Sequence, residues 1–347
     1  MPPGLALFRA FPKLEATIAR TPLGSFPTPV EHAARLGQRI GVSALYVKRD
    51  EDTSPLYGGG KVRKLELFFG DAIARGKRSV VTFGGAGSNQ AVATAVLGKS
   101  LGLDVTVCLA PQPPGETVRR NLLAVAGTGA TIRPFASVSS AERAVQDHHD
   151  EGTYVIPMGG TSPLGNLSFV SAGLELAEQI ASKLLPKPDA IYVALGSGGS
   201  VLGVAIGLAL SGIDSEVIGV RASNPTTVTE ATLARMLGET ALFARSLGLV
   251  LPDRLEKLRL RIDGREVGRG YGYATSAGES ARAMARETEG YELEPVYGAK
   301  AFAALVRDAP GDQPILFWSS ASRPPEVDPL AIDHVPRELR GLARTRS

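Results

Sequence analysis

The sequence predicts an α/β protein whose mainly parallel sheets are covered by helices. Short apolar runs rich in β-branched residues alternate with longer segments of helical periodicity, which is the order that βαβ units produce. No segment repeats at a short fixed period. The 347 residues, 44% of them hydrophobic and 21% charged, suffice for one large or two modest domains with their own cores.

The individual elements follow from this alternation. Glycines at 102 and 127 are expected to end two of the helices. Residues 157–166, rich in Gly, Pro, Ser and Thr, suggest a crossover, whereas 251–272 does not fit the pattern and the tail from Ala331 is expected to be frayed or surface-bound. The predicted strands are 79–82, 105–109, 131–133, 154–156, 190–194 and 216–220, and the predicted helices are 88–101, 117–126, 139–151, 167–183 and 200–210.

Composition argues against several partners and locations. The net charge is +3, no basic run stands out and aromatic residues make up 6% of the chain, so a nucleic-acid partner is not expected. The single cysteine, Cys108, fits a reducing compartment, and we see no signal peptide, so the predicted location is cytoplasmic. Residues 191–213 carry no charge, but glycines 196, 198 and 199 interrupt them. We therefore predict a buried strand, loop and helix there and no membrane partner.

The first segment that could carry chemistry is Tyr57-Gly-Gly-Gly-Lys61-Val-Arg-Lys-Leu-Glu66. Three glycines allow the backbone to pass close to a flat ligand. Lys61 follows them at the expected start of a helix, where the helix dipole lowers the pKa of an amine and favours the neutral form that makes imines. The structural alternative is a plain turn before a basic helix start.

The second segment, Gly84-Gly-Ala-Gly-Ser-Asn-Gln90, lies between a predicted strand and a predicted helix. Its glycines free backbone N–H groups, and Ser88, Asn89 and Gln90 stand at the helix N-terminus, which suits a carboxylate or another anion. The alternative is that Ser88 or Asn89 simply caps the helix.

The third segment, Gly196-Ser-Gly-Gly-Ser200, follows a strand and opens a helix, as a phosphate cradle does. Gly199, Gly203 and Gly207 also leave one helix face bare for close packing. The alternatives are a tight turn or a dinucleotide fingerprint, although the third glycine of that fingerprint is misplaced. Residues 93–100 fit a relaxed P-loop pattern but are expected to be helical, and the four histidines do not suggest a metal site.

These three segments, in this order, resemble the pyridoxal 5′-phosphate (PLP) enzymes of the tryptophan-synthase-β type, also called fold type II. Within that group the sequence is most similar to the 1-aminocyclopropane-1-carboxylate (ACC) deaminase and D-cysteine desulfhydrase family. The resemblance covers most of the chain. Its further segments are Thr28-Pro29, Val47-Lys48-Arg49-Asp50, Gly159-Gly160-Thr161-Ser162, Leu293-Glu294-Pro295-Val296-Tyr297-Gly298-Ala299-Lys300 and Ile315-Leu316-Phe317-Trp318.

The resemblance implies two open, twisted, mainly parallel sheets with the cofactor between their domains. The small domain would span about 60–165, and residues 1–59 and 166–347 would form the large one. It also implies a homodimer and a small amino acid as substrate. By this resemblance, Lys61 would form a Schiff base with PLP and transfer the α-proton, and Asn89 would hydrogen-bond the ring hydroxyl of the cofactor. Ser88 and Gln90 would bind the substrate carboxylate, Tyr297 would lie near the substrate, and Ser320 would face the pyridine nitrogen. The phosphate would be bound by Ser197, Gly198, Gly199 and Ser200.

The chain also departs from the family. Deaminases carry a glutamate directly after the tyrosine that Tyr297 matches, and here it is Gly298. Desulfhydrases show His-Thr-Gly-Gly near the end, and here the stretch is Ser319-Ser-Ala-Ser322. Trp318 and Tyr273 are therefore expected to reshape the substrate pocket.

The predicted function is PLP-dependent breakdown of a small amino acid to ammonia and a 2-oxo acid, with or without sulfide. Ring opening, elimination, replacement and racemisation remain open at this point. The alternatives of another class are a catalytically silent PLP- or ligand-binding homologue and a nicotinamide-dependent oxidoreductase.

Overall fold

The computed structural model describes residues 3–148, 150–309 and 311–344, without the side chain of His148. The chain forms two compact units. The first comprises Met1–Thr17, Ser25–Thr53 and Thr161–Ala321, and the second comprises Ile18–Gly24, Ser54–Gly160 and Ser322–Ser347. Short 3₁₀ helices connect longer elements: η1 (Pro12–Ala16), η2 (Asp50–Asp52), η3 (Met158–Gly160), η4 (Leu255–Lys257) and η5 (Pro329–His334).

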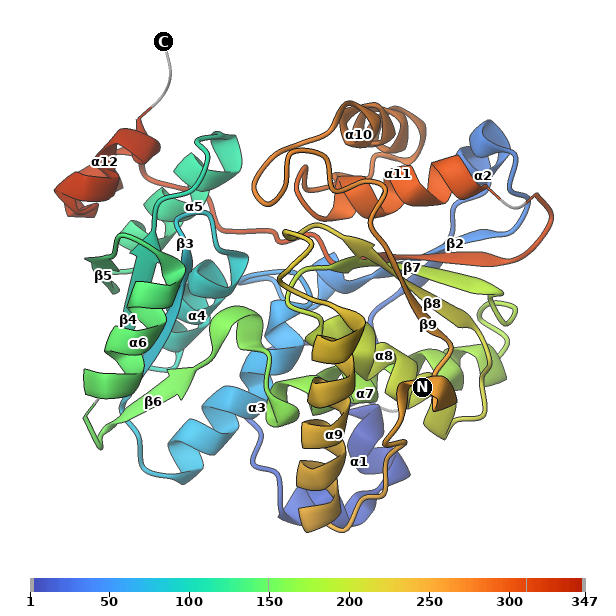
Figure 1. Cartoon of the computed structure of the whole chain (residues 1–347), viewed down its shortest axis with the longest axis horizontal. Helices are drawn as coiled ribbons and strands as arrows, with labels where there is room; N and C mark the ends of the chain where they lie inside the picture. Colours follow the sequence, from blue (N-terminus) through green and yellow to red (C-terminus); the bar gives the residue numbers. More distant parts are fainter. Residues whose placement is uncertain (1–2, 149, 310, 345–347) are drawn as a thin grey trace. The chain divides into compact units, whose positions relative to one another are not determined.

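The first unit is built on a six-stranded sheet with helices on both faces (Figure 1). Only β1 runs antiparallel to its neighbour. The strand order is β1 (Val30–His32), β2 (Leu45–Arg49), β10 (Ile315–Ser319), β7 (Ala190–Leu195), β8 (Glu216–Arg221) and β9 (Leu260–Asp263). One face carries α2 (Ala34–Ile40), α10 (Ser276–Glu289) and α11 (Gly298–Asp308), and the other carries α1 (Ala6–Ala10), α7 (Pro163–Ala181), α8 (Gly199–Leu210) and α9 (Glu230–Ser246).

Helices α7 and α8 pack unusually closely because glycines line their contact. A Cβ atom added at Gly207 would lie 2.3 Å from the carbonyl oxygen of Val170, and one at Gly203 would lie 2.5 Å from Phe169 Cβ. The bare helix face expected from the glycine spacing is therefore confirmed. Residues 191–213 form β7, a loop and α8, and no helix in the described part of the chain is long and apolar enough to cross a membrane.

The second unit contains a four-stranded sheet in which every pairing is parallel. Helix α6 covers one face over a small core of Val81, Phe83, Cys108, Ala141 and Val145, and α4 packs against the same strands together with α3 and α5. The strand order is β5 (Thr131–Pro134), β4 (Asp104–Ala110), β3 (Ser79–Gly85) and β6 (Thr153–Ile156), and the helices are α3 (Lys61–Ala74), α4 (Asn89–Ser100), α5 (Glu116–Gly127), α6 (Val138–His148) and α12 (Arg337–Ala343). Both the predicted α/β fold class and the helical state of residues 93–100 are confirmed.

Two stretches join the second unit from outside the predicted range of 60–165. The buried carboxylate of Glu66 on α3 accepts hydrogen bonds from the backbone N–H groups of Leu23 and Gly24 at 2.8 and 3.0 Å and pairs with Arg20 at 2.7 Å. At the other end of the chain, α12 and η5 pack on α5 and bury Leu339 and Val335. These contacts are long-range, so composition alone does not reveal them.

Candidate active site

Lys61 is the first residue of α3, and its side chain is half-buried. Its Nζ donates to the carbonyl oxygen of Gly159 at 3.0 Å. Burial lowers the pKa of the Lys61 amine to about 8, because the charged form is poorly solvated there. The predicted position at a helix start is confirmed, and the cause of the lowered pKa is loss of solvent.

A second lysine shares the same acceptor. Lys64 is buried, and its Nζ also donates to Gly159 O at 3.0 Å. Burial, followed by the charge of Lys61, lowers the pKa of Lys64 well below its ordinary value. A Cβ added at Gly160 would lie 3.0 Å from both Lys64 Cδ and Gln90 Oε1, so the turn at η3 brings the lysines and Gln90 together. The Nε2 group of Gln90 donates to Thr94 Oγ1 at 3.1 Å.

Ser88 and Asn89, at the start of α4, form a helix cap and a hydrogen bond to a distant asparagine. Ser88 is the N-cap, and its Oγ accepts from Ala91 N at 3.3 Å. Asn89 Oδ1 accepts from Asn121 Nδ2 at 2.9 Å, and the same Nδ2 donates to Gly87 O at 2.8 Å. Because this bond uses the oxygen of the Asn89 amide, the Nδ2 group of the same amide is left to act as a donor. Asn121, 32 residues away in sequence, was not predicted from the sequence.

The glycine loop of the first unit is shaped for an anion. Gly198 has φ +94°, and α8 then begins at Gly199 without a side-chain cap on its N–H groups. A Cβ at Gly199 would lie 2.3 Å from Asn166 Oδ1, so only glycine lets the backbone pass there. Ser197 Oγ and Thr161 Oγ1 are hydrogen-bonded at 2.6 Å. Free N–H groups and hydroxyls at a helix N-terminus suit a phosphate.

Tyr297 lies against the same loop. A Cβ at Gly196 would be 3.0 Å from Tyr297 Cε1. The ring of Tyr271 meets that of Tyr297 edge-on, with centroids 6.2 Å apart. Burial, then the neighbouring Tyr271, raises the pKa of Tyr297 well above 10. Trp318 on β10 pairs with Val193 on β7, and Ser320 directly follows the last residue of β10, Ser319.

Two predicted substrate residues have other neighbours. Tyr273 lies under the guanidinium of Arg269, 4.3 Å from the ring centroid. Trp318 is 1% exposed, and its Nε1 donates to Asp50 Oδ2 at 3.0 Å. The structure therefore places Tyr271, which sequence reasoning passed over, beside Tyr297, and it places Trp318 in the interior of the first unit. The contacts that the structure gives for Tyr273 and Trp318 therefore do not support the predicted substrate roles of these two residues.

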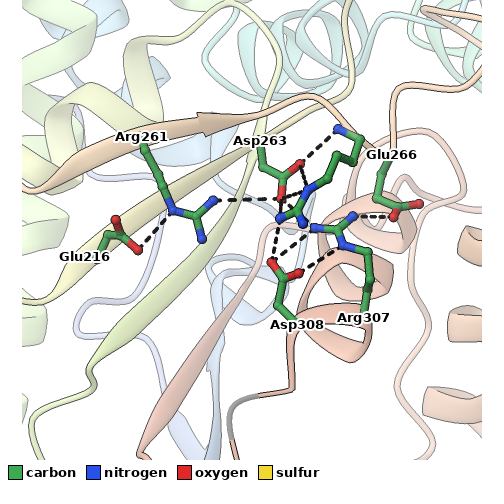
Figure 2. A network of polar contacts seen from close by, with 7 residues as sticks. Glu216, Arg261, Asp263, Glu266, Arg307 and Asp308 are labelled. Carbon is green, nitrogen blue, oxygen red and sulfur yellow. Dashed lines mark hydrogen bonds and ion pairs between the residues drawn. The ribbon is translucent and has the colours of Figure 1, made fainter.

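The opposite, amino-terminal edge of the six-stranded sheet carries a strongly charged pocket of about 700 Å³. Its charges pair with one another and with their neighbours, as Figure 2 shows for Arg261 with Glu216, which both line the pocket, and for Arg307 with Asp263 beside it. Burial alone would raise the pKa of Asp263, but hydrogen bonds from Arg265 and the charge of Arg307 bring it down to about 2. Such mutual pairing is typical of a structural network.

The fold and these groups define a class of enzyme. A lysine with a lowered pKa can hold a carbonyl cofactor, a donor amide can bind an oxygen on its ring, and an uncapped glycine-rich helix start can bind a phosphate. The residues present therefore fit PLP, which has an aldehyde, a ring hydroxyl and a phosphate.

Comparison with known proteins leads to the same cofactor. Residues 22–320 match the family described as "Pyridoxal-phosphate dependent enzyme", and the chain belongs to that family. It is 34% identical to a nocardicin C-9′ epimerase of Nocardia uniformis, with 88% of this chain and 93% of the relative covered, and 32% identical to a D-cysteine desulfhydrase of Salmonella schwarzengrund, with 90% and 95% covered. A solved structure titled as an ACC deaminase homologue matches with a TM-score of 0.74 and 30% identity over 91% of this chain and 94% of that one. The protein is thus a PLP-dependent enzyme of fold type II, and the nicotinamide alternative is set aside.

Proposed function

We propose that this protein is a PLP-dependent lyase that breaks down a small amino acid by α,β-elimination. The α-proton and a group on the β-carbon leave the substrate, and water then yields a 2-oxo acid and ammonia. With a thiol as leaving group, sulfide is the third product. The observation that carries this proposal is Lys61, whose half-buried amine has a pKa of about 8 and a single carbonyl as its hydrogen-bond partner among the described residues. That amine is basic enough to take an α-proton and neutral enough to be a nucleophile.

The remaining proposed roles are those that the family resemblance implies. PLP, when bound, supplies the electron sink for the reaction. Lys61 would hold it and move the α-proton, and Asn89, fixed by Asn121, would donate to its ring hydroxyl. The phosphate would lie on Ser197–Ser200, with Ser320 at the ring nitrogen. Ser88 and Gln90 would hold the substrate carboxylate, and Tyr297 would lie near the reacting carbon.

An elimination of the D-cysteine desulfhydrase type is favoured over ring opening by the start of α11. Gly298 is its first residue and offers no carboxylate beside Tyr297. A Cβ at Gly298 would meet nothing closer than Leu293 Cβ at 3.9 Å, so a side chain can start there without a clash at its Cβ. We therefore expect Gly298→Glu to fold normally. A gain of ACC turnover in Gly298→Glu would support the view that the missing carboxylate excludes ring opening, and no gain would contradict it.

Epimerisation is a second candidate, because the relative with 34% identity is named an epimerase. Both reactions start with loss of the α-proton, but epimerisation returns a proton and releases no ammonia. Incubation of each amino acid in deuterated water separates them. Deuterium at the α-carbon with inversion and without ammonia would replace elimination by epimerisation.

The first experiment is the visible absorption spectrum of the purified protein beside Lys61→Ala. We expect a yellow band from lysine-bound PLP in the wild type and none in the variant, followed by a panel of D- and L-amino acids scored for ammonia, sulfide and 2-oxo acid. The matched control is Lys77→Ala, a partly exposed lysine just after α3. No band after addition of PLP would sink the proposal, and a band without turnover of any amino acid would indicate a silent homologue.

A homodimer and a cytoplasmic location belong to the same proposal. The first is supported by the family likeness and the second by the single, buried cysteine. Sedimentation equilibrium of the PLP-loaded protein tests the dimer, and a monomer at micromolar concentration would contradict it.

A further inference from the structure

Lys300, near the start of α11, places its ammonium group on the backbone of a distant loop. Its Nζ donates to Val267 O at 2.9 Å and to Gly270 O at 3.2 Å. The side chain is 0% exposed. A buried ammonium is usually paired directly with a carboxylate, but among the described residues Lys300 forms no ion pair. Its direct partners are neutral carbonyl oxygens, as they are for a bound monovalent cation. Burial lowers the pKa of Lys300, and the nearby charges of Glu294 and Glu266 oppose that effect and favour the ammonium form.

The loop that Lys300 holds has a backbone that only glycine adopts easily. Gly268, Gly270 and Gly272 have φ values of +59°, +112° and +84°. Tyr271 lies between the last two, and its backbone N–H donates to Asn224 Oδ1 at 3.1 Å. Lys300 therefore donates hydrogen bonds to two carbonyl oxygens of the loop, and Asn224 accepts one from the backbone N–H of Tyr271. A flexible, glycine-rich segment is fixed in one conformation by two side chains.

This loop places the ring of Tyr271 against the ring of Tyr297. The two rings meet edge-on at 69°, with their centroids 6.2 Å apart. Tyr297 is the N-cap of α11, three residues before Lys300, and its N–H donates to Glu294 Oε2 at 2.7 Å. The start of α11 thus carries both Tyr297 and Lys300, whose ammonium group binds the loop that contains Tyr271.

We propose that Lys300 is a positioning residue, a built-in cation that fixes the 267–272 loop so that the ring of Tyr271 stays in edge-on contact with that of Tyr297, as one pair. The inference rests on the proposed function, in which Tyr297 lies near the substrate. It makes a specific chemical claim. If the side chain is removed, a free cation of the size of ammonium restores the pair, because the carbonyl oxygens that bind it are still present.

The test uses the PLP-loaded protein labelled with fluorotyrosine, and Tyr271→Phe and Tyr297→Phe assign the two fluorine signals. In Lys300→Ala we expect both signals to shift and broaden, because the loop is no longer held. Ammonium chloride should restore them, whereas tetramethylammonium chloride at equal concentration should not, because it is too large for the site. Lys300→Met, which fills the site without a charge, should show the shift without any rescue. Lys257→Ala, an exposed lysine outside this cluster, is the matched control and should leave both signals unchanged.

Turnover is the second readout. Misplacing a tyrosine near the reacting atoms should lower kcat roughly 10- to 100-fold in Lys300→Ala, with about tenfold recovered by ammonium. Unchanged tyrosine signals in Lys300→Ala, or equal rescue by both cations, would overturn the proposal. If Lys300→Ala does not fold, unchanged signals in Lys300→Met have the same meaning. If no amino acid is turned over by the wild type, the proposed function fails, but the fluorine signals still decide the role of Lys300.

Discussion

Lys61 in the second unit and Lys48 in the first show how two lysines of one chain come to opposite uses. Lys48 is 0% exposed, and its Nζ donates to Glu175 Oε1 at 2.5 Å, to Gln179 Oε1 at 2.8 Å and to the carbonyl oxygen of Thr28 at 2.8 Å. Lys61 has one neutral acceptor at 3.0 Å. The carboxylate of Glu175 holds Lys48 in place by an ion pair, whereas among the described residues Lys61 donates only to a neutral carbonyl. Burial lowers the pKa of Lys61, and its amine remains available for chemistry. The immediate partners decide the use of a lysine more than its burial does.

The largest expected effect is a divergence between Lys48→Met and Lys61→Met. The first leaves the carboxylate of Glu175 buried without its cation, which costs about 3–5 kcal/mol of unfolding free energy. The second removes an amine that the fold solvates poorly, so its unfolding free energy should equal or exceed that of the wild type. Urea unfolding after removal of PLP measures both, so that binding of the cofactor does not enter. If Lys61→Met proved the less stable of the two, the contrast between the two lysines would be reversed.

The pH dependence of stability sharpens the same contrast. The pKa of Lys61 is lowered to about 8 in the folded protein, from 10.5 for an ordinary lysine. Below pH 8 both states carry the proton, and the folded state bears the full penalty of a poorly solvated charge. Between these two values the unfolded chain binds more protons, so the wild type gains stability as the pH rises, by about 3 kcal/mol in total. The difference in unfolding free energy between wild type and Lys61→Met should shrink over this range, and a constant difference would contradict the lowered pKa.

Much of the framework behind this contrast follows from the sequence. Between residues 79 and 221 each predicted strand and helix is present with its ends moved by a few residues, because apolar alternation and glycine stops are local signals. The same signals located Lys61, Ser88 and the glycine loop at helix starts. These positions are fixed by neighbours in sequence, so a sequence can predict them.

Other features depend on contacts between distant residues. All five residues of β10 are buried, so alternation could not tell that Trp318 turns to Asp50. In Gly270-Tyr-Gly-Tyr273, Tyr271 and not Tyr273 contacts Tyr297, because Asn224 and Lys300 bind the backbone of this loop. Asn121 reaches Asn89 across 32 residues. In each case nothing in the sequence around the partner residue distinguishes it from other surface or core residues, so only the folded structure shows the contact.

The smallest expected effect completes the comparison with a lysine on the surface. Lys187 pairs with Asp214 at 2.5 Å, as close as Lys48 is to Glu175, but the two side chains are 45% and 69% exposed. Water solvates both charges whether or not they meet, so the short distance carries little free energy. Lys187→Met should therefore leave the urea midpoint and the visible band of bound PLP unchanged, at low and at high salt. A clear loss of stability that salt removes would mean that distance, and not the burial of the partner, governs these ion pairs, and the explanation given for Lys48 would have to change with it.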